Sequence, residues 1–156
     1  MIKLDRTLTY RLHLLHKLTD AVSHRAYVAG AGLSMSDGRC LTAVGTFAPL
    51  SVNDLAKKAN LNKGQASRAA QSLVDQGLVL KAASPTDGRG VVLTLTAEGQ
   101  TAWQRAMDVV ARRNNDIFGV LSTEEQTQLS RFFDRLIDEA RNEAQADGEL
   151  AEDSDE

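Results

Sequence analysis

Polar and basic side chains follow one another between positions 63 and 72, with no acidic residue before Asp75. Arginine can donate two hydrogen bonds to guanine and glutamine can exchange two with adenine, whereas lysine and serine suit phosphates as well as bases. This set of side chains therefore has the chemistry that reads the edges of base pairs. The candidate contacts are Lys63, Gln65, Ser67, Arg68 and Gln71.

A further candidate, Arg89, comes directly after Asp87 and Gly88. Asp-Gly is a strong signal for the tight turn of a β-hairpin. A long cationic side chain just past such a turn could enter a narrow minor groove, where the negative potential of DNA is concentrated. The plainer alternative is that these residues only close the hairpin.

Histidine and cysteine offer two other kinds of chemistry. His13 and His16 lie one helical turn apart, and histidines at this spacing could share a zinc ion. The sequence has no second histidine pair and no cysteine near this one, so we expect no metal site. Cys40 could sense oxidants only with an exposed thiol of lowered pKa. Its neighbours Leu41 and Val44 put it on an apolar helix face, which predicts a buried thiol.

The predicted contacts between 63 and 72 lie on the second of two short helices. Ser51 with Asp54, and Asn62 with Gln65, have the spacing of capping boxes, in which side chains accept N–H groups left unbonded at a helix start. The tripeptide 60–62 predicts a tight turn, because asparagine tolerates a left-handed backbone. Apolar positions repeat with helical spacing in both helices: Val52, Leu55, Ala56 and Ala59, then Ala66, Ala69, Ala70, Leu73 and Val74.

Longer segments with periodic apolar residues flank the two short helices. Gly77 is expected to end the second short helix. Alternating side chains on both sides of the Asp-Gly turn predict two short strands. Gly30 and Gly32 are expected to break the first helix. Thr96 and Ser122 are expected to cap the last two helices. The predicted helices are 4–28, 36–47, 51–59, 62–76, 97–120 and 123–145, and the predicted strands are 78–82 and 91–96.

Two short helices joined by a three-residue turn form the helix-turn-helix layout, whose second helix enters the major groove. The hairpin that follows would be its wing. Each piece alone also fits an ordinary surface helix or hairpin, but the ordered series is much harder to obtain by chance. The predicted fold is mainly α with a small β-hairpin wing. Its domains are a dimerisation helix at 1–30, a winged helix-turn-helix lobe at 31–96, dimerisation helices at 97–146 and a disordered acidic tail at 147–156.

The charge distribution agrees with a DNA-binding lobe although the net charge of the chain is −3. Residues 51–90 contain six Lys and Arg against three Asp and Glu. Residues 139–156 contain eight acidic residues against Arg141 alone. The acid is therefore concentrated in the tail and the rest of the chain is mildly basic, which favours attraction of phosphates.

Composition excludes several classes of protein. The 156 residues are 42% hydrophobic and 25% charged, as in ordinary soluble domains. No apolar run approaches the roughly 20 residues of a membrane span, and the first 18 residues lack the apolar region of a signal peptide. We therefore expect a cytoplasmic protein. No phosphate-binding glycine loop, nucleophile elbow or H-E-x-x-H motif occurs, so we expect neither an enzyme nor a cofactor.

The chain resembles the MarR (multiple antibiotic resistance regulator) family of bacterial transcriptional regulators. The resemblance rests on Leu55-Ala56, on Ser67-Arg68, on the run from Leu73 to Val79, and on the wing. From Asp87 to Gly99 the wing has the pattern D-x-R-x-x-x-L-x-L-T-x-x-G. One departure is Gly38, where the family often has an aromatic residue.

The resemblance implies an obligate homodimer in which the first and last helices intertwine. It implies that Arg89 enters the minor groove with Asp87 bracing it, and that Lys63, Gln65, Ser67 and Arg68 lie on the recognition helix. It also implies a pocket for an aromatic acid or phenol between the helical region and each lobe. The candidate lining residues of that pocket are His13, His16 and Arg39.

The sequence thus predicts a repressor that binds a pseudo-palindromic operator in duplex DNA as a dimer and loses affinity when a small molecule binds. Two alternatives remain open. One is a redox- or metal-responsive regulator of the same fold, and the other is a winged-helix adaptor that binds protein instead of DNA.

Overall fold

The computed structural model describes residues 1–86, 88 and 90–153, with side chains described up to 148. The chain divides into two compact units, Met1–Asn114 and Asn115–Glu156. Helices dominate both units, and one antiparallel hairpin lies in the first, so the predicted fold class is confirmed. None of the described helices has both the length and the apolar character that a membrane span requires.

The first long helix, α1 (Leu8–Ala31), follows a single 3-10 turn, η1 (Leu4–Arg6). The Thr7 hydroxyl accepts a hydrogen bond from the backbone N–H of Tyr10, which fixes the start of α1. The helix therefore begins four residues later than the apolar periodicity predicted.

Gly30 lies inside α1, so the expectation that it breaks the helix is wrong. A Cβ at this position would lie 2.6 Å from side-chain atoms of Val109 and of Arg112. The glycine thus lets the helix that carries these two residues pack closely against α1. Gly32 does end the helix, with a left-handed φ of 67°.

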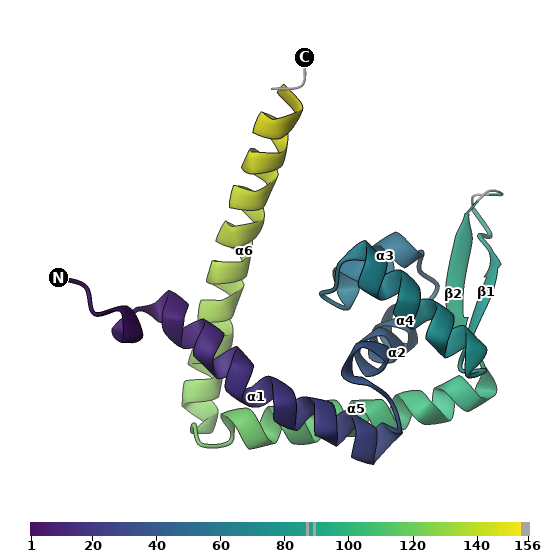
Figure 1. Cartoon of the computed structure of the whole chain (residues 1–156), viewed down its shortest axis with the longest axis horizontal. Coiled ribbons are helices and arrows are strands. Elements are labelled where there is room, and N and C mark those ends of the chain that lie inside the picture. The colour runs from purple at the N-terminus through teal and green to yellow at the C-terminus, as the bar shows by residue number, and fades with distance from the viewer. Residues whose placement is uncertain (87, 89, 154–156) are drawn as a thin grey trace. The chain divides into compact units, whose positions relative to one another are not determined.

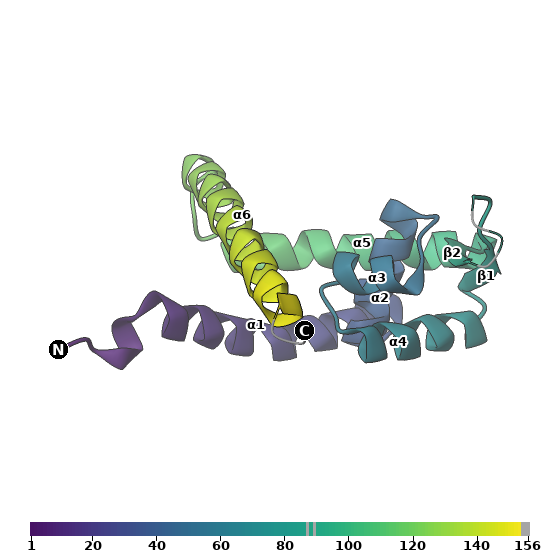
Figure 2. The ribbon, with the colours of Figure 1, turned by 90° about the horizontal axis from the view of Figure 1, so that it is seen from above.

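The helix-turn-helix lies beside its hairpin, which is at the edge of the first unit (Figures 1 and 2). Helices α2 (Met35–Phe47), α3 (Val52–Lys58) and α4 (Lys63–Asp75) contact one another, and the strands β1 (Val79–Ala83) and β2 (Val91–Leu95) follow. Every one of these elements was predicted, with ends that agree within one or two residues.

The turn between α3 and α4 forms as its asparagines predicted. Asn60 has a φ of 57°, the left-handed conformation that asparagine tolerates. The Asn62 side chain accepts from the Gln65 N–H at 2.8 Å, and the Gln65 side chain accepts from the Asn62 N–H at 3.2 Å. This complete capping box pairs two backbone N–H groups and so fixes the start of α4 directly after the turn.

A single apolar core joins these elements. Three small residues of α4, Ala66, Ala69 and Ala70, are buried, so the helix packs closely on α2 and α3. Leu50 pairs with Leu93 of β2 through two backbone hydrogen bonds, which ties the hairpin to the segment before α3. The largest fully buried side chains are Cys40, Leu41, Val44, Leu55, Leu73, Val79, Leu93 and Val109.

Thr96 links the hairpin to the next helix, α5 (Ala97–Phe118). Its hydroxyl accepts from the Gly99 N–H at 2.9 Å and donates to the Gly77 carbonyl at 2.6 Å. The predicted cap is therefore confirmed, and it also fixes the base of the hairpin.

The last helix, α6 (Thr123–Asp153), begins with the predicted capping box. The Ser122 N–H donates to the Glu125 side chain and the Glu125 N–H donates to the Ser122 hydroxyl. The helix does not end near 145 as predicted. The expectation of a disordered tail is wrong for residues 147–153, where glutamate, leucine and alanine favour helix and no proline interrupts them. Residues 154–156 lie outside the described residues.

Candidate DNA-binding surface and effector pocket

Helix α4 turns its alanine face toward the core and its polar face outward. Among the predicted contacts, Lys63, Ser67 and Arg68 are exposed and make no hydrogen bond or ion pair within the described chain. A Cβ at Gly64 would lie 3.3 Å from the Arg68 guanidinium, so this side chain lies back over a position without a side chain. These three side chains are available to an external partner.

The two glutamines of the same face are exposed but engaged. Gln65 uses its amide oxygen in the capping box. Gln71 accepts from Lys81 and donates to Asp75. A bidentate contact with adenine needs both the amide oxygen and the NH2 group. Part of this capacity is already used within the lobe, and the roles of both glutamines as DNA contacts remain predictions.

A polar cluster joins the start of α2 to the end of α4. The Asp37 carboxylate accepts from the Ser72 hydroxyl at 2.7 Å and from the Gln76 side chain at 3.2 Å. Ser72, which the sequence placed on the polar face of α4, therefore contacts another helix of the lobe. This cluster helps to set the position of the recognition helix.

The two predicted wing contacts, Asp87 and Arg89, lie outside the described residues. The hairpin below them is closed by a hydrogen bond of 2.8 Å from the Ser84 N–H to the Gly90 carbonyl. The β1–β2 register, from Val79 opposite Leu95 to Ala83 opposite Val91, extends the hairpin away from its buried base.

A pocket of about 370 Å³ lies beside the helix-turn-helix within the first unit. Two of the three predicted lining residues, His16 and Arg39, line it together, and His13 is not among its lining residues. The other lining residues are Thr42, Lys58, Ala59 and Asn60. The pocket thus includes the end of α3 and the turn that leads into α4.

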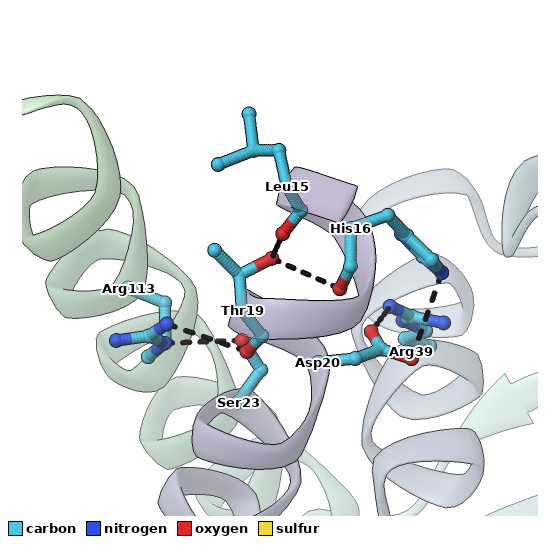
Figure 3. A network of polar contacts seen from close by, with 7 residues as sticks. All are labelled: Leu15, His16, Thr19, Asp20, Ser23, Arg39 and Arg113. Atoms are coloured by element: carbon cyan, nitrogen blue, oxygen red, sulfur yellow. Dashed lines mark hydrogen bonds and ion pairs between the residues drawn. The ribbon is translucent and has the colours of Figure 1, made fainter. Parts of the chain in front are cut away.

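Asp20 connects the two predicted pocket residues (Figure 3). Its carboxylate lies 3.3 Å from Nη2 of Arg39 and 3.6 Å from Nε2 of His16, on opposite oxygens. Through these contacts Asp20, on α1, orients the side chains of both His16 on the same helix and Arg39 on α2. The pocket lining itself holds no carboxylate, so its charged groups are basic.

A smaller apolar hollow of about 240 Å³ shares Thr42 and Lys58 with this pocket. Phe47, Met107 and Val110 are among its lining residues. The Lys58 ammonium lies 4.6 Å from the centre of the Phe47 ring, a cation–π distance. Lys58 therefore separates a polar hollow from an apolar one.

Gly38 is the departure from the family pattern, and another residue fills the space that a side chain at this position would take. A Cβ at Gly38 would overlap the ring of Tyr27, which is buried against α2. Burial raises the pKa of the Tyr27 phenol, and the positive charge of Arg39 opposes that shift. An aromatic side chain therefore lies here after all, contributed by α1.

Cys40 is fully buried, as predicted. Burial, with a smaller contribution from the Asp37 carboxylate, raises the pKa of its thiol to about 12. A thiol in this environment stays protonated near neutral pH and is a poor nucleophile. Within the described residues, no three His, Cys, Asp or Glu side chains gather as metal ligands would.

Known proteins share this arrangement. A sequence model described as MarR family matches residues 31–90, which include α2, the helix-turn-helix and part of the wing. The HTH-type transcriptional repressor Rv2887 of Mycobacterium tuberculosis is 28% identical over 111 residues, which are 71% of this chain and 80% of that protein. The crystal structure of Rv2887 with salicylic acid matches with 26% identity and a TM-score of 0.68, covering 85% of this chain and 97% of that one. Residues 31–90 therefore match the MarR family model, and the chain is similar to a solved MarR-family protein over most of its length.

A second solved structure extends the likeness of fold. The PcaV transcriptional regulator of Streptomyces coelicolor, in complex with its natural ligand, has a TM-score of 0.70 at 22% identity. The match covers 90% of this chain and 98% of that protein. The MarR-family fold thus accounts for nearly the whole chain, including the helices outside residues 31–90.

Three residues of the candidate surface and pocket were not predicted from the sequence. Lys58 and Asn60 line the pocket, and Lys81 contacts the recognition helix. Lys58 was counted only among the basic residues of the lobe, and Asn60 only as a turn residue. The alternation of side chains in β1 was a usable signal for Lys81, because it puts this residue on the same face as the buried Val79.

Proposed function

We propose that this chain is a transcriptional repressor of the MarR family that acts in the cytoplasm by binding duplex DNA, not an enzyme. The observation that carries the proposal is the outer face of α4, where Lys63, Ser67 and Arg68 have no partner within the described chain. Side chains of these types serve bases and phosphates of the major groove. The relatives named as repressors support the same reading.

The second element of the proposal is a homodimer. Apolar side chains are exposed along α1, and others are exposed along α6, which is unusual for a monomer in water. A second copy of the chain would cover them and would present two recognition helices to a pseudo-palindromic operator. The exposed residues of α1 include Leu8, Leu12, Leu15, Leu18 and Val22, and those of α6 are Phe132, Phe133, Leu136 and Ile137.

The third element is an anionic effector, with an aromatic acid as the class to test. The basic lining from His16, Arg39 and Lys58 suits a carboxylate, and the hollow beside Phe47 suits an apolar ring. The solved structure of Rv2887 holds salicylic acid. Because Lys58 and Asn60 belong to the helix-turn-helix, a ligand that prefers one position of these residues would change DNA affinity by its differential binding.

The test of the main proposal is binding to mixed genomic DNA fragments at several salt concentrations. We expect a subset of fragments to be retained, with affinity that falls steeply as salt rises. Added salicylate should release them. Binding to no DNA at any salt concentration would contradict the proposal and would favour an adaptor that binds protein.

The pocket has its own test, in which salicylate binding is measured by calorimetry. Arg39→Ala and Lys58→Ala should each weaken binding by about ten- to a hundredfold, the range for a lost hydrogen bond to a charged group. Arg105→Ala, which removes a positive charge elsewhere on the same unit, serves as the control. Equal losses in all three variants would mean that only the overall charge matters.

A further inference from the structure

Gln71 lies on the exposed face of α4, yet both ends of its side-chain amide are engaged. Its amide oxygen accepts a hydrogen bond of 2.8 Å from Nζ of Lys81. Its NH2 group donates a hydrogen bond of 2.8 Å to the carboxylate of Asp75. Because Lys81 belongs to β1 and Asp75 ends α4, Gln71 is a side-chain link between the hairpin and the recognition helix.

The strand geometry explains why Lys81 reaches α4. Side chains two residues apart in a strand point to the same face. Val79 is buried in the lobe core, so Lys81 starts from the same face of β1. The long stem of lysine can pass along the apolar surface and leave its charge in water. The ammonium consequently lies at the outer face of α4, beside Gln71.

The contact leaves Lys81 with the charge and the donors that a phosphate requires. The Gln71 amide is neutral, so it orients the ammonium without cancelling its charge. An ammonium has three N–H donors, and Gln71 takes one of them. A salt bridge at the same place would have neutralised the charge that attracts DNA.

We propose that Gln71 is a positioning residue and not a base reader, and that it holds Lys81 at the recognition helix as an additional contact to a DNA phosphate. The inference rests on the proposed DNA binding. The two hydrogen bonds of Gln71 use one acceptor site of the amide oxygen and one N–H of the NH2 group, and they direct the amide toward Lys81 and Asp75. As a link, it keeps both and fixes the angle between hairpin and helix.

The experiment is a double-mutant cycle on a duplex that the wild-type protein retains, with affinity measured over a range of salt concentrations. Lys81→Ala should lower the slope of log affinity against log salt by about 0.9 per protomer, the value for one phosphate, and so by about 1.8 for the proposed dimer. Gln71→Ala should reduce affinity on the order of two- to fivefold, the range of an exposed charged contact. That second loss should be the same for all base sequences and should disappear in the Lys81→Ala background.

Gln71→Glu adds a sharper contrast. The glutamate can still accept from Lys81, but it neutralises the ammonium and adds negative charge next to Asp75. We expect it to weaken DNA binding more than Gln71→Ala does. Tighter binding by Gln71→Glu would overturn the role of Lys81 as a phosphate contact.

Controls separate this inference from the proposed function. Arg105→Ala removes one positive charge from α5 and should leave the salt slope nearly unchanged, and all variants should melt near the wild-type temperature. The inference is overturned if Gln71→Ala changes the preferred base at one position per half-site, or if its effect persists without Lys81. Failure of the wild-type protein to bind any duplex would instead overturn the proposed function, and this inference with it.

Discussion

The helix-turn-helix with its hairpin and the outer helices α1 and α6 differ in where their apolar side chains lie. In the helix-turn-helix and its hairpin, the periodic apolar positions are buried in one core, which includes Leu55, Leu73 and Leu93. In α1 the apolar residues from Leu8 to Val22 are exposed, and in α6 Phe132 to Ile137 are exposed. The lobe therefore buries its own apolar side chains, whereas those of the outer helices, α1 and α6, need another surface to cover them.

The difference indicates that the two regions have different roles. A lobe with a complete core can present a polar face to DNA, because its apolar positions are already buried within it. The outer helices can instead use their apolar stripes for association. Changes on the polar face of the lobe should then alter DNA binding with little effect on stability. Changes in the outer helices should alter stability and assembly, and should alter DNA binding only through loss of the dimer.

The largest effect is expected from removing the first part of α1. Deleting residues 1–22 takes away one exposed apolar stripe and leaves its proposed counterpart on α6 uncovered in the dimer. We expect aggregation or loss of folding, measured by sedimentation and circular dichroism. A soluble, folded monomer would contradict the intertwined dimer and would erase the contrast between the two regions.

The next largest effect is expected at the wing tip. Arg89→Ala should abolish most operator affinity while the dimer and its melting temperature stay nearly unchanged, because a cation in a narrow minor groove contributes to DNA binding alone. Asp87→Ala should also lose affinity, though less, since we propose that Asp87 directs the guanidinium. If Asp87→Ala binds operator DNA more tightly at moderate salt, simple charge repulsion governs this loop.

Two residues of α4 should respond differently from each other. Arg68→Ala should weaken specific binding by about 1–3 kcal/mol and relax the preference at one base position per half-site, as loss of a bidentate base contact would. Lys63→Ala should weaken binding to all sequences alike and reduce its salt dependence. Equal losses that do not depend on sequence would remove Arg68 from base reading.

The last effect concerns the lobe core and is confined to alkaline pH. The pKa of Cys40 is raised to about 12 from a usual value of 9.0, so the folded state favours the neutral thiol. This stabilisation is fully present below pH 9 and is lost as pH rises from about 9 toward 12. The free energy of unfolding of the wild type should therefore fall over this range more than that of Cys40→Ala. A thiol reagent that reacts rapidly at pH 8 with the folded protein would contradict the burial of Cys40.

Much of the lobe could be predicted because its signals are local. The Asn62–Gln65 box, the left-handed Asn60 and the Thr96 cap involve residues within three positions of each other, so their hydrogen bonds follow from sequence spacing alone. The buried faces followed from periodicity. The length of α6 did not follow from the acidic composition of its end, because glutamate and alanine in that segment favour helix.

The candidate site was predicted in part. His16 and Arg39 do line one pocket, but they do so because α1 and α2 pack together through Asp20, 19 residues before Arg39. Lys58 joins them from a third helix, and no spacing in the sequence connects it to His16. His13, one helical turn from His16, has no place in the lining.

The sequence by itself determined the order of the elements, the face of each lobe helix that is buried and the turn that presents α4, because these depend on contacts between near neighbours and on hydrophobic spacing. Only the tertiary structure decided how the exposed polar residues are used. From its residue type and position, Gln71 is expected to contact a base. The packing of β1 against α4 instead brings Lys81 within hydrogen-bond distance of its amide oxygen. Gly30 looks like a helix breaker, but the approach of Val109 explains why it lies within α1. Both outcomes depend on residues distant in the chain, whose distances are set only when the core closes.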